Sequence, residues 1–94
     1  MKSLEECRAA LDAVDRQIVR LFEERMIISR DVAKYKIANQ LPVLDASREE
    51  QVLASRASMA QDAYWQEDIR RLYESIMAIS RAEQQKLLDR AGEE

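Results

Sequence analysis

Apolar residues recur at alternating spacings of four and three along the first part of the chain. The series contains neither Gly nor Pro, and its members are Leu4, Cys7, Leu11, Val14, Ile18, Leu21, Ile28, Val32 and Tyr35. This heptad spacing keeps the apolar side chains on one face of an α-helix. Ser3 and Glu6 form an S-x-x-E capping box at the start of the series. The pattern therefore predicts one long helix from Ser3 to about Asn39.

The long helix is followed by a predicted break and a short helix. Pro42 disfavours helical backbone in the residue before it, so we expect residues 40–44 to form an extended connection. Ser47 and Glu50 form a second capping box. That box predicts the start of a short helix, which carries Val52 on its apolar stripe.

A third helix, of medium length, is expected in the last third of the chain. It follows a turn at about residues 61–65 and runs from about Gln66 to Leu88. Residues 89–94 are expected to fray, as chain ends often do. The chain has one Gly, one Pro and many helix-forming residues. It is therefore predicted to be a single all-α domain over residues 1–94, with its core at about 4–88.

The length of the first helix predicts an intertwined homodimer. A helix of about 35 residues is roughly 52 Å long, whereas a compact globule of this size has a diameter only slightly above about 30 Å. Two shorter helices of the same chain would leave much of its apolar face uncovered. Pairing with a second copy about a two-fold axis is the commonest way to cover such a face.

Composition and charge exclude several classes of function. The net charge is −3 with both signs interspersed, so neither nucleic acid nor a membrane surface is an expected partner. No apolar run approaches the roughly 18 residues of a membrane span, and the start lacks the apolar core of a signal peptide, so a soluble, cytoplasmic protein is expected. The lone Cys7 has no partner for an internal disulfide. The absence of His excludes the usual metal-ligand sets and His-based acid/base chemistry.

Polar residues stand at positions where the helical pattern demands apolar ones. Arg25 interrupts the heptad between Ile18 and Val32, and Lys36 returns to nearly the same face eleven residues later, so both cations can point into one pocket. The predicted inward faces of the other two helices carry four more polar residues: Arg48, Glu49, Ser80 and Gln84.

Each of these residues also has a purely structural interpretation. Arg25 could reach the surface or pair with Glu49, and Lys36 could simply be solvated. Glu49 could interact favourably with the dipole of its helix, and Ser80 could donate to a backbone carbonyl of its own helix. Gln84 could fix the register in which two chains pair in a dimer. As a group, however, they would bury more positive than negative charge, which requires an anionic partner. We therefore expect a small dianionic ligand that also carries a hydroxyl group, gripped by forked arginine contacts.

The chain resembles the helical chorismate mutases over about residues 4–88. The segments that carry the resemblance are Glu24-Arg25, Val32-Ala33-x-x-Lys36, Pro42-Val43-x-Asp45-x-x-Arg48-Glu49, Ile79-Ser80-Arg81-Ala82-x-Gln84, and Arg8 four residues after Leu4. The resemblance implies rearrangement of chorismate to prephenate in phenylalanine and tyrosine biosynthesis, without metal or cofactor. The reaction is concerted and intramolecular, so it needs neither a nucleophile nor an acid/base pair.

The resemblance also implies roles for the site residues. Lys36 and Gln84 would hydrogen-bond the ether oxygen of the substrate, and Glu49 would accept from its ring hydroxyl. The substrate-binding residues would be Arg8, Arg25, Arg48, Asp45 and Ser80. Arg8 would act across the dimer, because Arg8 and Arg25 are about 25 Å apart along one helix and on different faces.

Two other functions remain open from the sequence. An isochorismate-pyruvate lyase uses the same scaffold and cation set, although that family looks less like the segment from Asp45 to Glu49. A non-catalytic helical dimer, serving as an interaction or regulatory module, would bind no ligand and would tolerate Arg25→Ala.

Overall fold

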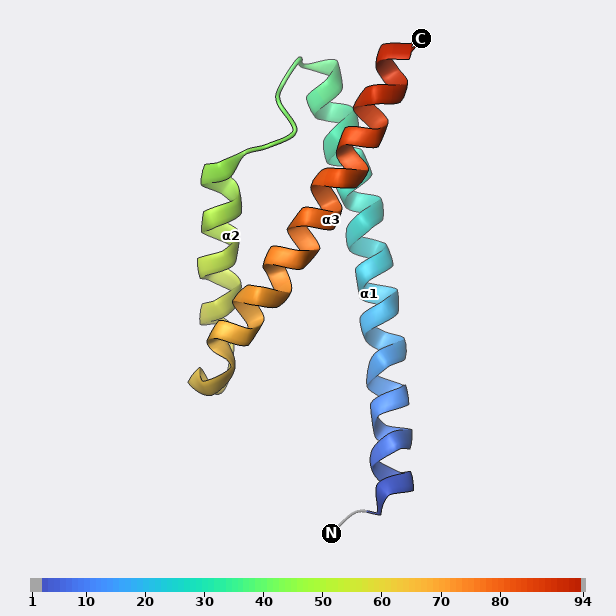
Figure 1. Cartoon of the computed structure of the whole chain (residues 1–94), viewed down its shortest axis with the longest axis vertical. Helices are drawn as coiled ribbons and strands as arrows, with labels where there is room; N and C mark the ends of the chain where they lie inside the picture. Colours follow the sequence, from blue (N-terminus) through green and yellow to red (C-terminus); the bar gives the residue numbers. More distant parts are fainter. Residues whose placement is uncertain (1–2, 94) are drawn as a thin grey trace.

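The computed structural model describes residues 3–93, and within this range all regular secondary structure is helical. The elements are α1 (Leu4–Ala38), α2 (Ala46–Ser58), the short 3-10 helix η1 (Ala63–Trp65) and α3 (Gln66–Glu93). The predicted all-α fold of one long, one short and one medium helix is therefore confirmed (Figure 1). No helix in the described range is long and apolar enough to cross a membrane.

The first helix begins and ends where its sequence signals predict. The Glu6 backbone N–H donates to Ser3 Oγ at 3.1 Å, which is the first bond of a capping box. The Glu6 side chain contacts the hydroxyl of Ser3, which donates to Oε1 at 3.3 Å. At the other end, Asn39 Nδ2 donates to the Tyr35 carbonyl at 2.9 Å. Gln40 then adopts a left-handed backbone with φ of 56°, which stops the helix directly before the connection that contains Pro42.

The second helix starts earlier than predicted. Its N-cap is Asp45, whose Oδ1 accepts from the Arg48 N–H at 3.0 Å, and Ala46 is its first residue. The predicted capping box at Ser47 and Glu50 is therefore wrong. Asp caps a helix as well as Ser does, and its charge also interacts favourably with the helix dipole. Asp45 comes two residues earlier, so Ser47 is already inside the first turn.

The turn before α3 is made by η1, which Asp62 caps by accepting from the Tyr64 N–H at 2.9 Å. The third helix starts at Gln66 as predicted but continues to Glu93. The predicted end of this helix at about Leu88 is therefore wrong, because residues 89–93, which were expected to fray, are helical. Glu94 lies outside the described residues. Gln85 Nε2 donates to Asp89 Oδ1 at 2.9 Å across the predicted end, where no helix breaker stands.

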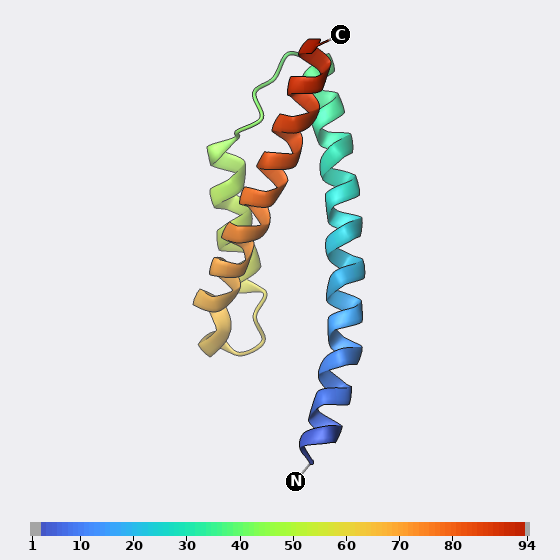
Figure 2. The same cartoon turned by 45° about the vertical axis from the view of Figure 1, so that its right-hand side comes forward.

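The three helices form a thin, elongated molecule that measures 58 × 26 × 14 Å. Helix α3 packs against both α1 and α2. Figure 1 shows that α3 starts beside the end of α2 and crosses α1 near the other end of the molecule, and Figure 2 shows its middle part between the two helices. Within residues 3–93, no further element covers the outer faces of these helices.

The core of the single chain is small. The buried apolar residues are Ala33, Val52 and Met77, and no large side chain in the described range is fully buried. By contrast, every residue from 4 to 21 is exposed. Figure 2 shows this N-terminal half of α1 extending away from α2 and α3. Apolar residues such as Leu11 and Ile18 therefore lie uncovered, at 60% and 57% exposure.

Candidate functional site

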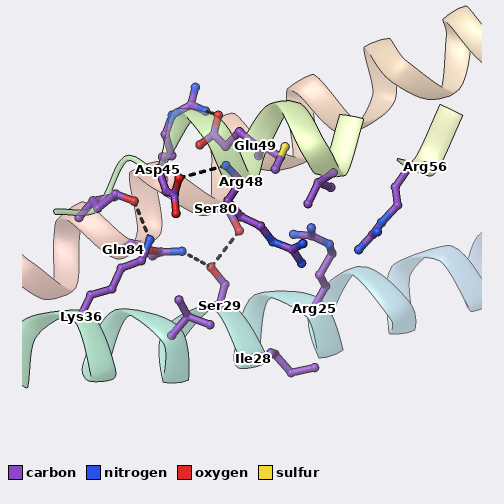
Figure 3. A pocket seen from close by; sticks show the side chains of 15 residues that line it. Arg25, Ile28, Ser29, Lys36, Asp45, Arg48, Glu49, Arg56, Ser80 and Gln84 are labelled. Carbon is purple, nitrogen blue, oxygen red and sulfur yellow. Dashed lines mark hydrogen bonds and ion pairs between the residues drawn. The ribbon is translucent and has the colours of Figure 1, made fainter. Parts of the chain in front are cut away.

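One cavity, of about 340 Å³, lies where the three helices approach one another (Figure 3). Seven of the eight residues predicted for the site line it: Arg25, Lys36, Asp45, Arg48, Glu49, Ser80 and Gln84. They come from all three helices and from the connection after α1. Apolar groups, among them Val32 and Met77, complete its wall.

The two cations of α1 both line the cavity. The guanidinium carbon of Arg25 lies 5.8 Å from the centroid of the Tyr73 ring, a cation–π arrangement that leaves its N–H groups free to bind an anion. Lys36 Nζ donates to the Val43 carbonyl at 2.7 Å. An ammonium has three donors, so this bond leaves two for a ligand. Lys36 is half-buried rather than freely solvated.

Three buried polar side chains form a hydrogen-bonded group on one wall. Gln84 Nε2 donates to Ser29 Oγ at 2.9 Å, and Ser29 Oγ lies 2.9 Å from Ser80 Oγ. These are the buried polar residues of residues 3–93, and Gln84 Oε1 has no hydrogen-bond partner there. The second N–H of the Gln84 amide also remains unused in the described chain. A buried amide with unused hydrogen-bonding groups indicates a place for a polar ligand.

The network bears on one structural interpretation of Ser80. The hydroxyl of Ser80 contacts Ser29 and the sulfur of Met26 rather than a carbonyl of its own helix, so the back-bonding interpretation is wrong. Gln84 is bound within its own chain. Ser29 was not predicted as a site residue, although it lies four residues after Arg25 and seven before Lys36. This spacing places the three residues on one face of the helix.

The two carboxylates of the cavity belong to the N-cap and the first turn of α2. Asp45 is engaged as the N-cap. Glu49 Oε1 forms an ion pair with Arg81 Nη1 of α3, so the interpretation that paired Glu49 with Arg25 is wrong. Arg48 Nη1 donates to Gln51 Oε1 at 3.0 Å and has no ion pair in the described range.

Positive charge dominates the cavity. Five cationic side chains line it, against two carboxylates, an excess of three positive charges in a chain whose net charge is −3. The cations are Arg25, Lys36, Arg48, Arg56 and Arg81. Of these, only Arg81 has an ion pair within residues 3–93. Four cations without a carboxylate partner in one cavity favour binding of a multiply charged anion.

Arg56 and Arg81 were not predicted as site residues. Arg56 lies four residues after the buried Val52, and Arg81 four after the buried Met77, so the helical period alone could have placed both near the cavity. Figure 3 shows Arg25 from α1 and Arg56 from α2 pointing toward one another. Two guanidinium groups that approach each other gain from an anion between them.

Comparison with known families agrees with this geometry. The profile of the family described as chorismate mutase type II matches residues 7–85. The chain belongs to this family. No curated protein and no solved structure gave a significant match. The chorismate mutase match runs from the first turns of α1 into the second half of α3, so it includes every residue of the cavity and also Arg8.

Arg8 is the one predicted site residue of this chorismate mutase family member that does not line the cavity. It lies in the exposed N-terminal half of α1 (Figure 1). Seventeen residues of helix separate it from Arg25, about 25 Å along the axis. Arg8 therefore cannot reach the cavity of its own chain.

Proposed function

We propose that this protein is a chorismate mutase, which rearranges chorismate to prephenate in the synthesis of phenylalanine and tyrosine. Family membership supports mutase-type chemistry. The observation that carries the specific proposal is the cavity itself, which is lined by four cations without carboxylate partners and by a buried amide that has unused hydrogen-bonding groups. Chorismate offers matching groups, because it is a dianion with an ether oxygen and a ring hydroxyl. The cytoplasmic location expected from the sequence remains part of this proposal.

The proposed catalytic groups act on the ether oxygen. As the bond to this oxygen breaks, negative charge develops on it, and fixed donors aimed at that charge lower the barrier. Lys36 would use one of its two free N–H groups, and Gln84 would use its second amide hydrogen. Glu49 would accept from the ring hydroxyl through the oxygen that Arg81 leaves free. The other contribution is conformational, because the flexible side chain must be held over the ring.

The proposed carboxylate-binding groups are guanidinium groups, which take a carboxylate in a forked pair of hydrogen bonds. Arg25 and Arg48 reach the cavity from α1 and α2 without carboxylate partners in the described chain. Asp45 and Ser80 would complete the wall around the ligand. Asp45 would do so from the start of α2, and Ser80 through the network that holds Gln84.

We further propose that the active form is an intertwined homodimer. The proposal is supported by the uncovered apolar face of residues 4–21, by the thin, elongated shape and by the three-residue apolar core. A second copy packed on this face by two-fold symmetry would bury it in both chains. Such a dimer would also bring Arg8 of the partner subunit to the cavity. There it would bind the substrate carboxylate that Arg25 does not bind.

A turnover assay with chorismate and isochorismate tests the proposal. We expect chorismate to disappear with formation of prephenate, and Arg25→Ala to abolish most of this activity. Release of pyruvate from isochorismate, without conversion of chorismate, would instead identify the lyase. If neither compound is bound or converted, the protein is a non-catalytic helical module.

A further inference from the structure

Two neighbouring carboxylates of α2 are each paired with an arginine of α3. Glu50 binds Arg70 at 2.9 Å outside the cavity, and its hydrogen bond raises the pKa of the Arg70 guanidinium. Glu49 binds Arg81 inside the cavity. The Glu49 side chain is 22% exposed, compared with 65% for Glu50. The two pairs thus join the same helices, but only one of them faces the ligand site.

The pair inside the cavity determines which cations remain available. Glu49 stands among five cations, and a carboxylate that is free to move would pair with one of them. Pairing with Arg25 or Arg48 would occupy a group that the proposed ligand needs. Arg81 instead engages Glu49 from α3. Arg25 and Arg48 have no ion pair in the described range.

The ion pair with Arg81 also leaves the second carboxylate oxygen of Glu49 available to a ligand. Arg81 Nη1 contacts Oε1 of Glu49, and no hydrogen bond to Oε2 is present within residues 3–93. A carboxylate oxygen accepts readily from a hydroxyl group. With one oxygen fixed, the other has a defined position, which reduces the entropy lost when a ligand hydroxyl binds to it.

We propose that Arg81 is a positioning residue for Glu49. It holds one carboxylate oxygen, aims the other at the hydroxyl of the ligand, and keeps Arg25 and Arg48 free for the ligand carboxylates. This inference deepens the proposed mutase function and rests on it.

Three variants measure the effect. Arg81→Met keeps most of the side-chain length but removes the guanidinium. We expect kcat/KM for chorismate to fall about tenfold, as for the loss of a partly exposed charge-assisted hydrogen bond. We also expect KM to rise, because the released Glu49 carboxylate then competes with the ligand for the carboxylate-binding cations. Arg81→Lys should recover part of the loss. The matched control is Arg70→Met, which breaks the pair with Glu50 and should leave kcat/KM unchanged.

A double-mutant cycle shows whether Arg81 acts through Glu49. In the Glu49→Gln background, Arg81→Met should change kcat/KM by no more than about twofold. Additive effects would mean that Arg81 acts on the ligand directly and would overturn the proposal. It would also be overturned if Arg81→Met and Arg70→Met lowered the melting temperature equally and neither changed kcat/KM, because the pair would then be structural only.

Binding and turnover of chorismate by the unmodified protein distinguish failure of this inference from failure of the proposed function. If it binds chorismate without converting it, the mutase proposal fails, and the same cycle measured on the Kd by calorimetry decides the role of Arg81. If it does not bind chorismate at all, both proposals are wrong.

Discussion

The two halves of α1 share one apolar series, which is interrupted only at Arg25, but they have very different surroundings. Residues 22–38 lie along α3, bury Ala33 and supply Arg25, Ser29 and Lys36 to the cavity. Residues 4–21 contact neither of the other helices closely enough to bury a single side chain. A periodic apolar face thus predicts a helix but does not show whether, or by which chain, that face is covered.

The largest expected effect comes from a charge in the uncovered half. If a second copy covers this face, Leu11→Asp places a carboxylate in an apolar interface, which costs several kcal/mol. Because each chain has so small a core, we expect loss of both the dimer and the helical structure, measured by sedimentation and circular dichroism. Ala13→Asp is the control, since two residues turn the helix by about 200° to its opposite side. Equal behaviour of the two variants would mean that this half stays in solvent.

The next largest effect is expected in the covered half. Lys36→Ala removes a preorganised donor, so kcat should fall by about a hundredfold to a thousandfold. Lys34→Ala serves as the control because Lys34 is exposed and does not line the cavity. A variant in which only KM rises would assign Lys36 to substrate binding instead of catalysis.

A subunit-mixing experiment tests whether the two halves of α1 contribute to one shared site. Arg8→Ala and Arg25→Ala dimers should each be nearly inactive, but a mixture refolded together should regain about a quarter of the parent activity. Half of its dimers would be mixed, and one of the two sites in each would be intact. Mixing Arg25→Ala with Lys36→Ala should give no recovery, since both residues belong to the cavity of one chain. Absence of recovery in the first mixture would argue against a shared site.

The smallest expected effect is a change in pH dependence. Gln84→Glu keeps the shape of the side chain, but a carboxyl donates a hydrogen bond only when protonated. Burial beside a dianion favours the protonated form, and nearby Lys36 opposes this. We expect the variant to be active at acidic pH and to lose activity as the pH rises, while the parent changes little over the same range. An unchanged profile of kcat against pH would show that Gln84 does not contact the reacting oxygen.

The sequence predicts most of the fold because its local signals are strong. The limits of α1 follow from an uninterrupted pattern and the Ser3 cap, and the start of α3 at Gln66 was predicted correctly. The start of α2 was missed because Asp45 and Ser47 are both good caps only two residues apart. The end of α3 was missed because no breaker stands near Leu88, so nothing local marks where the helix stops.

The site was predicted less completely than the fold, for a different reason. Of the eight predicted site residues, all but Arg8 line one cavity. Ser29, Arg56 and Arg81 were missed because their importance depends on contacts between distant segments. Arg81, for example, matters through an ion pair with a residue 32 positions away. Helical spacing places such a residue on a face, but only the packing of α2 against α3 identifies its partner.

The thin shape and small core of the single chain have a consequence for how much of the protein is folded. A chain 14 Å thick with three buried apolar residues has little stability of its own, so in the proposed dimer folding and association would be one event. The free energy of unfolding of the dimer then depends on protein concentration. Each tenfold dilution lowers this free energy by about 1.4 kcal per mole of dimer. A cell that makes few copies would therefore hold a smaller folded fraction, not just fewer active molecules. The level of expression would itself set how much of the enzyme works.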